Sequence, residues 1–358
     1  MTKLKEHKPS KMEALKAMTP ADRRRAVFDG IMNNAMFIII ALVIIYVAIK
    51  NPRFLSVPSL VNIISLTAAK LPIALGVGGC IILAGTDISA GRQVGLAACI
   101  SAGLQLTTNK LFPGLQVMPI PVVLLCVLVA CALVGFVNGF FMAKFKLHPF
   151  IVTLSTQLIV YGLVLLFMQL GTNSGQTLSG MSETYRSLII NPLFTLQTSS
   201  GPVTVPRYVL YSAVITAIVW VIWNKTAFGK NMYAVGSNEE AANVSGVNVT
   251  KTIILVFVMA GMLYGITGFM DAARISSVNA TTGLNYESDA IAACVIGGIS
   301  FVGGIGKVSG AIIGVLLLQI IFAGLNFLSV DANYLYIVKG LIILIACSID
   351  MRKYLVRK

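Results

Sequence analysis

Ten apolar stretches separated by polar segments dominate the pattern of this chain. Most approach the roughly 20 mainly apolar residues that a membrane-spanning helix needs. The eighth is short, and the second contains Lys70 and Pro72. The pattern predicts an all-α, polytopic transmembrane helix bundle of about ten spans. The expected spans are residues 31–49, 62–84, 92–108, 119–143, 150–170, 207–224, 252–271, 288–302, 308–328 and 334–349.

The composition supports a membrane protein in contact with lipid. Of the 358 residues, 57% are hydrophobic and only 11% are charged, whereas soluble domains are about 25% charged. A soluble globular protein is therefore excluded. All six cysteines fall inside apolar stretches without CxxC spacing, and the two histidines are far apart. We expect no metal site and no disulfide framework.

The basic residues are distributed unevenly about the predicted membrane. The net charge of +14 could indicate a nucleic-acid partner. However, 19 of the 27 Lys and Arg residues lie in the two termini and in the loops on their side, against 6 on the opposite side. The positive-inside rule therefore predicts that both termini are cytoplasmic, with no nucleic-acid partner. Basic tails at 1–30 and 351–358 would flank a transmembrane domain at 31–350.

Two loops are long enough to carry structure of their own. Residues 171–206 form the predicted periplasmic loop, and residues 225–251 form the predicted cytoplasmic one. In the latter, Asn238 can cap a helix that begins with two glutamates and ends near Gly246. Such a short helix is not stable alone in water, so we expect it to pack against something. A structured connector and a docking site for a partner are both open.

A polar cluster lies between the second and third predicted spans, at Thr86, Asp87, Ser89, Arg92 and Gln93. A carboxylate at membrane depth is costly unless it is paired or hydrated, and Arg92 is the expected partner of Asp87. The pair could pin a sharp loop, or it could gate a solute path. We add three polar residues inside spans that packing explains poorly: Asn138, Gln157 and Asp289.

Two glycine-rich segments resemble each other. Residues 78–91 read GGCIILAGTDISAG, and residues 297–310 read GGISFVGGIGKVSG. A duplicated half and the ordinary recurrence of small residues at helix ends are equally good explanations.

The nucleotide-binding motif GxxxxGK[ST] is missing. The nearest match, FVGGIGKV at 301–308, has Phe301 in place of the first glycine and Val308 in place of the hydroxyl residue. We therefore expect that this chain binds no ATP. It also has no catalytic Ser/His/Asp or metal cluster, so we expect no enzyme activity.

Several of these segments resemble the permeases of ABC sugar importers. GSNEEAANVSGV at 236–247 is similar to their cytoplasmic coupling loop, and TDISAGRQVGLA at 86–97 is similar to a motif of the ribose/xylose/galactose branch. The latter form is most like the galactose/methyl-galactoside type. WNKTAFGKN at 223–231 and DAIAACVIGG at 289–298 agree with this. The resemblance covers about residues 35–354, and the tail 1–30 departs from it.

The resemblance implies a function and a set of partners. A separate ATPase subunit would bind the coupling residues and would carry the ATP and Mg, so this chain would hold no cofactor. A periplasmic sugar-binding protein and a second permease copy are the other expected partners, in a bacterial inner membrane. The coupling residues would be Gly236, Asn238, Glu240, Ala241, Ala242 and Gly246. The gate or path residues would be Thr86, Asp87, Ser89, Arg92, Gln93, Asn138, Gln157 and Asp289.

Three alternatives stay open. The transported solute could be another pentose or hexose, or a branched-chain amino acid. An ion-coupled secondary transporter would need buried ionisable groups, for which Asp87, Asp289, Lys70 and Lys339 are the candidates. A membrane scaffold without transport activity is the third, and the coupling loop argues against the last two.

Overall fold

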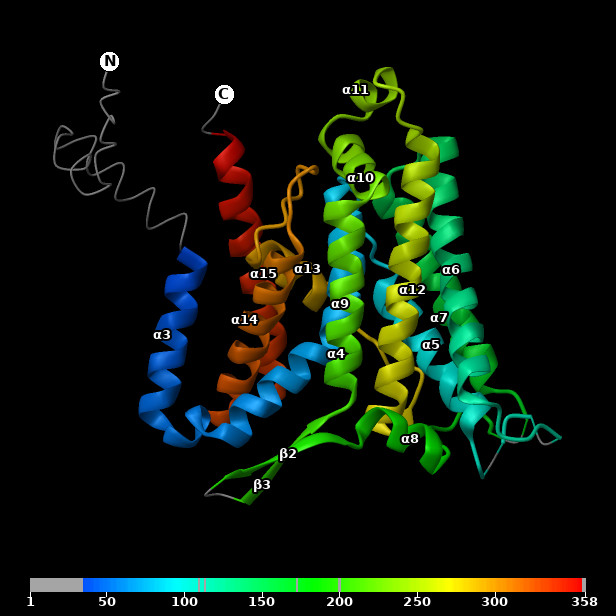
Figure 1. Ribbon diagram of the computed structural model, residues 1–358, viewed down its shortest axis with the longest axis vertical. Coiled ribbons are helices and arrows are strands. Elements are labelled where there is room, and N and C mark those ends of the chain that lie inside the picture. Colours follow the sequence, from blue (N-terminus) through cyan, green and yellow to red (C-terminus); the bar gives the residue numbers. More distant parts are fainter. Residues whose placement is uncertain (1–34, 109, 113, 172, 199–200, 356–358) are drawn as a thin grey trace, which may run out of the picture.

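The computed structural model describes residues 35–355 except 109, 113, 172 and 199–200 (Figure 1). The predicted tail 1–30 and the last three residues lie outside this part. The described part holds thirteen α-helices, a 3-10 helix and two small sheets. The helices are α3 (Ala35–Lys50), η1 (Pro52–Leu55), α4 (Val57–Ile82), α5 (Ala90–Gln105), α6 (Ile120–Phe145), α7 (Pro149–Met168), α8 (Glu183–Ile190), α9 (Tyr208–Lys225), α10 (Ala227–Ser237), α11 (Glu239–Val244), α12 (Val249–Ile275), α13 (Tyr286–Ile296), α14 (Val308–Phe327) and α15 (Ala332–Leu355).

The strands all lie at one end of the bundle. They are β1 (Leu178–Ser179), β2 (Pro192–Thr198), β3 (Gly201–Pro206) and β4 (Ser277–Val278). β2 and β3 form an antiparallel hairpin in which Thr198 pairs with Gly201. β1 pairs with β4, which ties the long predicted loop to the segment after α12. That loop is therefore ordered by α8 and the two sheets.

Each of the ten predicted spans contains a helix, but the helices differ in length. Counting only the residues that the structure describes, six are long and apolar enough to cross a membrane, namely α4, α6, α7, α9, α12 and α14. α13 has 11 residues, about 16 Å of helix, against a hydrocarbon core of about 30 Å. The predicted span at 288–302 is thus wrong in extent, because the chain leaves the helix at Gly297. A mostly helical, multi-pass membrane protein is confirmed.

The centre of the bundle is built around α12, which packs against α6, α5 and α4. Glycines allow this close packing. A Cβ added to Gly135 on α6 would overlap the carbonyl oxygen of Phe257 on α12, and one added to Gly261 on α12 would overlap the carbonyl oxygen of Cys131. Small residues at helix crossings let membrane helices approach each other, where lipid gives no hydrophobic driving force.

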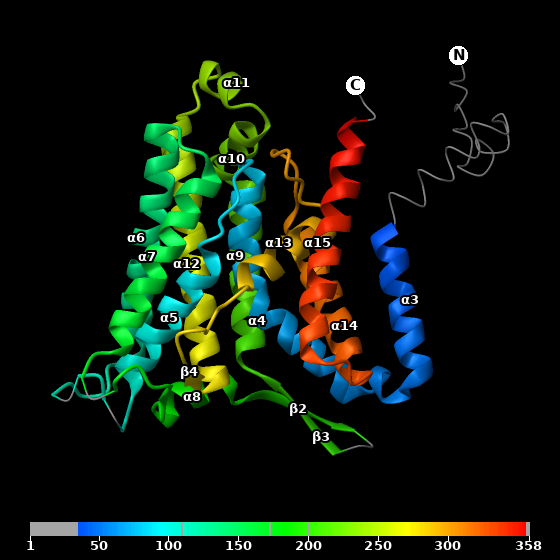
Figure 2. The same ribbon diagram turned by 180° about the vertical axis from the view of Figure 1, so that it is seen from behind.

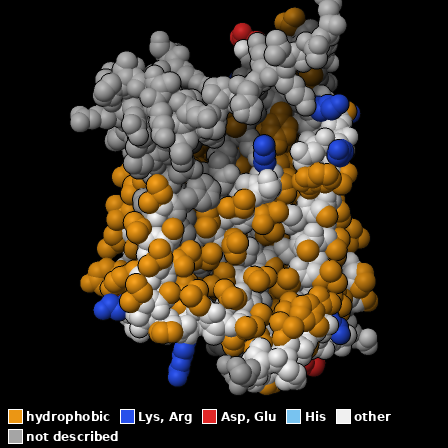
Figure 3. Space-filling view, turned by 60° about the vertical axis from the view of Figure 1, so that its left-hand side comes forward, with side chains coloured by type: hydrophobic (Ala, Val, Ile, Leu, Met, Phe, Trp, Pro, Cys, Tyr) orange, Lys and Arg blue, Asp and Glu red, His pale blue; other side chains and the backbone are white. Residues whose placement is uncertain are grey.

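The outer helices present apolar side chains to their surroundings. In α4 and α12, about two thirds of the residues in an apolar 18-residue stretch are buried inside the protein. In α6 and α7, the buried share of such a stretch is only 22% and 28%. The space-filling view shows the resulting hydrophobic band, with Lys and Arg side chains toward its two ends (Figure 3). α11 and the end of α15 lie at one end of the bundle. α8 and the β2–β3 hairpin lie at the other (Figures 1 and 2).

Candidate functional site

A buried polar network occupies the break between α4 and α5. α4 ends at Ile82, and the chain re-enters a helix at Ala90. In the connection, the Asp87 carboxylate accepts hydrogen bonds from the backbone nitrogen of Ser89 at 2.9 Å and from its hydroxyl at 2.5 Å. Asp87 and Ser89 are both fully buried. Asp87 therefore closes the turn that starts α5.

The Ser89 hydroxyl joins three elements. The side-chain amides of Gln93 on α5 and Asn138 on α6 each donate to Ser89 Oγ at 3.0 Å. Four predicted site residues therefore meet in one fully buried cluster. Within it, Asp87 Oδ2, Gln93 Oε1 and Asn138 Oδ1 are buried and have no hydrogen-bond partner among the described residues. Buried acceptors without partners cost free energy, so packing alone does not explain this cluster.

Arg92 does not pair with Asp87, and the predicted ion pair is wrong. No ion pair joins these two residues. Arg92 Nη1 instead donates to the carbonyl oxygen of Ala280 at 3.2 Å, and its guanidinium lies 4.1 Å from the ring centre of Tyr161 on α7. Asp87 lies in the connection before α5, whereas Arg92 lies in α5 itself. The Arg92 side chain therefore extends toward the loop before α13.

One face of α7 contacts the α4–α5 connection and α5. Thr153 donates to the carbonyl oxygen of Thr86 at 3.3 Å, and Tyr161 lies under Arg92. Gln157 lies one turn from each, and its Oε1 is buried and has no hydrogen-bond partner in the described part of the chain. Thr86, Arg92 and Gln157 thus lie beside the Asp87–Ser89 network and are not bonded into it.

Asp289 belongs to a separate polar group. It lies in the first turn of α13, and its Oδ1 is 2.8 Å from Nζ of Lys339 on α15. Nearby, Asp271 at the end of α12 is fully buried and pairs with Arg274 at 2.8 Å. Lys70 on α4 lies over the ring of Tyr286. Sequence reasoning did not pair these residues. The (i, i+3) spacing of Asp271 and Arg274 is the one signal that could have done so.

The predicted cytoplasmic segment holds two helices. Asn238 Oδ1 accepts from the backbone nitrogen of Ala241 at 2.9 Å, which caps α11 as predicted. Gly246 follows with φ +82°, also as predicted. α10, which precedes α11, was not predicted. Its start is capped by Thr226, which accepts from the nitrogen of Gly229.

Two of the predicted coupling residues, Gly236 and Ala242, are buried. Glu240 and Ala241 are exposed, and Val244 is 90% exposed. Ala242 is buried against its own chain, at 4% exposure, so it does not offer a surface to a partner. Glu239 forms an ion pair with Lys146, which follows α6. The surface that this segment offers to a partner therefore includes Asn238, Glu240, Ala241, Val244 and Gly246.

The end of α10 contacts both glycine-rich segments. A Cβ added to Gly236 would overlap the carbonyl oxygen of Ile82, the last residue of α4. The nitrogen of Gly304 donates to the same oxygen at 2.8 Å. Tyr233 donates its hydroxyl to the carbonyl of Gly306 at 3.0 Å, and burial raises the pKa of this phenol above its ordinary value. The two similar segments and α10 therefore meet at one point.

Comparison with known proteins places the chain in a family. Residues 59–347 match the family described as branched-chain amino acid transport system / permease component. The galactose/methyl galactoside import permease protein of Haemophilus influenzae is 41% identical over 334 residues, covering 92% of this chain and 97% of the relative. Its Escherichia coli K12 counterpart is 39% identical over 338 residues, covering 94% and 98%.

More distant relatives carry a different sugar in their names. The ribose import permease protein of Bacillus subtilis is 33% identical over 333 residues, covering 93% of this chain and 97% of the relative. No solved structure matches the chain. With a family match over most of its length and relatives that align almost end to end, the chain belongs to the permease components of import systems and is a transporter subunit.

Proposed function

We propose that this chain is the membrane-spanning permease of an ATP-driven importer of galactose and methyl galactosides. The proposed substrate rests on sequence identity. The chain is 38–41% identical to permeases named for these sugars and 32–33% identical to permeases named for ribose. Another pentose or hexose, or a branched-chain amino acid, is the alternative.

The proposed topology places the α11 end in the cytoplasm of a bacterial cell, with the protein in its inner membrane. The 19-to-6 distribution of basic residues supports this orientation and two cytoplasmic termini. α8 and the β2–β3 hairpin would then face the periplasm. Ten membrane segments are proposed, of which α5 and α13 enter the bundle without crossing all of it.

The proposed partners follow from this orientation. An ATPase subunit, which would carry ATP and Mg, would bind Glu240, Ala241 and Val244. A sugar-binding protein would contact the periplasmic end, and a second copy of this chain would complete the path. The chain itself is proposed to bind no cofactor. The contact of Gly236 with Ile82 supports a route by which movement of α10 and α11 reaches the Asp87–Ser89 network, the proposed gate.

The experiment that tests this function is reconstitution. The chain would be co-produced with its ATPase and binding protein and inserted into vesicles. We expect ATP-dependent uptake of galactose and of methyl galactoside that excess ribose or leucine does not inhibit. ATP hydrolysis that responds to ribose or leucine but not to galactose would refute the substrate assignment.

A further inference from the structure

The β2–β3 hairpin has one apolar face and one polar face. Side chains alternate between the two faces of a strand, and residues opposite each other in an antiparallel pair share a face. Two apolar pairs make up one face, Phe194 with Val205 and Leu196 with Val203. The other face carries the intervening pairs, Thr195 with Thr204 and Gln197 with Pro202. The hairpin is therefore amphipathic.

Only one strand of the apolar face is covered by the protein. β3 packs against α4 and α9, and Val205 is 9% exposed. On β2, Phe194 and Leu196 of the same face are 50% and 40% exposed. The hairpin extends sideways from the bundle, beyond these contacts (Figures 1 and 2). Because Phe194 and Leu196 share the face of Val205, they point toward the level of the membrane-spanning helices and not away from the end of the bundle.

A hairpin in this position needs a surface to lie on. Among the described residues its sheet consists of β2 and β3 alone, and an isolated two-stranded hairpin is at best marginally stable in water. Its base is held by the contacts of β3 and by the backbone nitrogen of Arg207, which donates to the carbonyl oxygen of Asn191 at 3.0 Å. The apolar side chains of β2 lie outside this support, so we expect another surface to cover them.

The hydrophobic band of the bundle continues to the hairpin. Leu55 in η1 and Val57, Leu60 and Ile64 at the start of α4 are exposed apolar side chains, and α4 is the helix on which β3 packs. On the side to which the hairpin extends, hydrophobic side chains continue toward the lower end of the molecule (Figure 3). Lipid covers such a band in a multi-pass membrane protein. The exposed face of β2 is therefore continuous with a surface that lipid already contacts.

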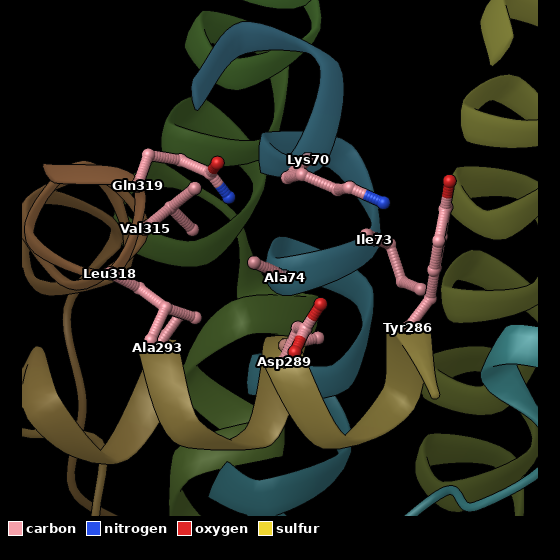
Figure 4. Close-up of a pocket in the computed structure, with 10 residues that line it drawn as sticks. Lys70, Ile73, Ala74, Tyr286, Asp289, Ala293, Val315, Leu318 and Gln319 are labelled. Carbon is pink, nitrogen blue, oxygen red and sulfur yellow. The ribbon is translucent and has the colours of Figure 1, made fainter. Parts of the chain in front are cut away.

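Basic side chains lie at the same end of the bundle. Lys50 ends α3, Arg53 lies in η1, and Arg207 directly follows β3; the first two are exposed. None of the three makes an ion pair within the described part of the chain. Lys70, by contrast, is enclosed between α4 and α13 (Figure 4). Lys and Arg at the ends of membrane helices extend to the lipid headgroups, so these three mark the headgroup level beside the hairpin.

We propose that the β2–β3 hairpin lies on the membrane surface, with Phe194 and Leu196 inserted among the phospholipids of the leaflet at the α8 end of the bundle. The unpaired backbone groups of a two-stranded sheet need water, so the hairpin stays at headgroup level and does not enter the hydrocarbon core. Interfacial amphipathic helices bury their apolar face by roughly 5–10 Å, and the same depth is expected here. The polar face stays in water. This contact fixes the start of α9 against the membrane and does not depend on the transported solute.

The test measures collisions of nitroxide labels with two reagents, using the full chain in vesicles of phosphatidylethanolamine and phosphatidylglycerol. Cys126→Ala and Cys347→Ala are introduced first, because the other four cysteines are buried. Labels are then attached separately to Phe194→Cys, Thr195→Cys and Leu196→Cys. Molecular oxygen concentrates in lipid, whereas a water-soluble nickel chelate is excluded from it. We expect a severalfold higher ratio of oxygen to nickel collisions at 194 and 196 than at 195.

Leu133→Cys is the matched control for a side chain in lipid, because Leu133 is exposed in the middle of α6. Its ratio should exceed those at 194 and 196, which lie nearer to the membrane surface. Nickel collisions as frequent at 194 and 196 as at 195 would show that the hairpin lies in water, which overturns the proposal. Shielding of 194 and 196 from both reagents, or dipolar broadening between labels, would assign the apolar face to a second copy of the chain and would overturn it as well.

Discussion

Asn138, in the second half of α6, donates its side-chain amide to the hydroxyl of Ser89, 3.0 Å away and 49 residues earlier in the chain. The same hydroxyl accepts from Gln93 and donates to Asp87. One oxygen therefore holds α6 and the α4–α5 connection together.

Ser89→Ala should lower both stability and transport. It leaves the amides of Gln93 and Asn138 without their shared acceptor and removes one of two hydrogen bonds to Asp87, and each orphaned buried group costs about 1–3 kcal/mol. Thermal unfolding of the purified protein and galactose uptake measure the two effects. The control is Ser101→Ala in α5, because that buried hydroxyl donates to the carbonyl of Ala97 one turn back. A loss no larger than that of the control would contradict the role of Ser89.

Exchanging Asp87 and Arg92 should not restore a functional protein. The two side chains have different partners, Ser89 for Asp87 and Ala280 with Tyr161 for Arg92. We expect Asp87→Arg combined with Arg92→Asp to transport no better than the worse single variant. Uptake by cells with equal amounts of each variant in the membrane decides this. Rescue by the double change would mean that the two residues pair.

Lys339→Met should destabilise the protein by leaving Asp289 without its cation. Breaking a buried ion pair costs about 3–5 kcal/mol, and this pair, with side chains 22% and 14% exposed, should approach the lower value. A double-mutant cycle with Asp289→Asn, read from thermal unfolding, gives the coupling. The exposed pair Glu183–Arg186 is the control and should couple by about 0–1 kcal/mol. Equal coupling in both pairs would refute the prediction.

Gly236→Ala should abolish the stimulation of ATP hydrolysis by galactose. The added methyl group overlaps the carbonyl of Ile82, so α10 must move away from α4. We expect loss of galactose-stimulated ATP hydrolysis with normal insertion into the membrane. Gly162→Ala is the matched control, because no atom lies within 4 Å of its added Cβ. Full stimulation in Gly236→Ala would show that this contact carries no movement.

Val244→Asp and Glu240→Lys should release the ATPase subunit without changing the membrane fold. Both side chains are exposed on α11, and Gly246→Pro should act similarly, because proline cannot adopt φ +82°. Co-purification of the ATPase with each variant is the measurement. Ala242→Trp is a poor test of docking, because Ala242 packs inside its own chain. Retention of the ATPase by all three variants would make the segment a connector.

Local patterns in the sequence were enough to predict the helices and their caps. Hydropathy located a helix in every predicted span, and Asn238 and Gly246 delimit α11 because capping depends on neighbouring residues. The length of α13 was not predictable from hydropathy. The apolar run continues to residue 302. The helix nevertheless ends at Gly297, and the next residue, Gly298, has a positive φ.

The polar contacts were the least predictable feature. Arg92 was paired with the nearest acid in sequence, yet its partners lie 69 and 188 residues away. In an apolar bundle any polar side chain is drawn to whichever polar group the helix packing brings near it. That choice depends on the tertiary arrangement, so it cannot be made from local spacing. Asp289 and Lys339 illustrate the same point, with 50 residues between them.

The contact of Gly236 and Gly304 with Ile82, at the meeting point of α10 with the two glycine-rich segments, is made of backbone. Gly304 bonds to the carbonyl of Ile82 through its nitrogen, and Gly236 lies against that carbonyl with no side chain between them. This contact depends on the small size of residue 236 and not on the chemistry of any side chain. We expect the meeting point to tolerate a relative's side chains around it as long as residue 236 remains glycine and residue 233 remains tyrosine, which bonds to Gly306. On the proposed function, a chimera that carries another permease's segment 225–251 should therefore bind that permease's ATPase.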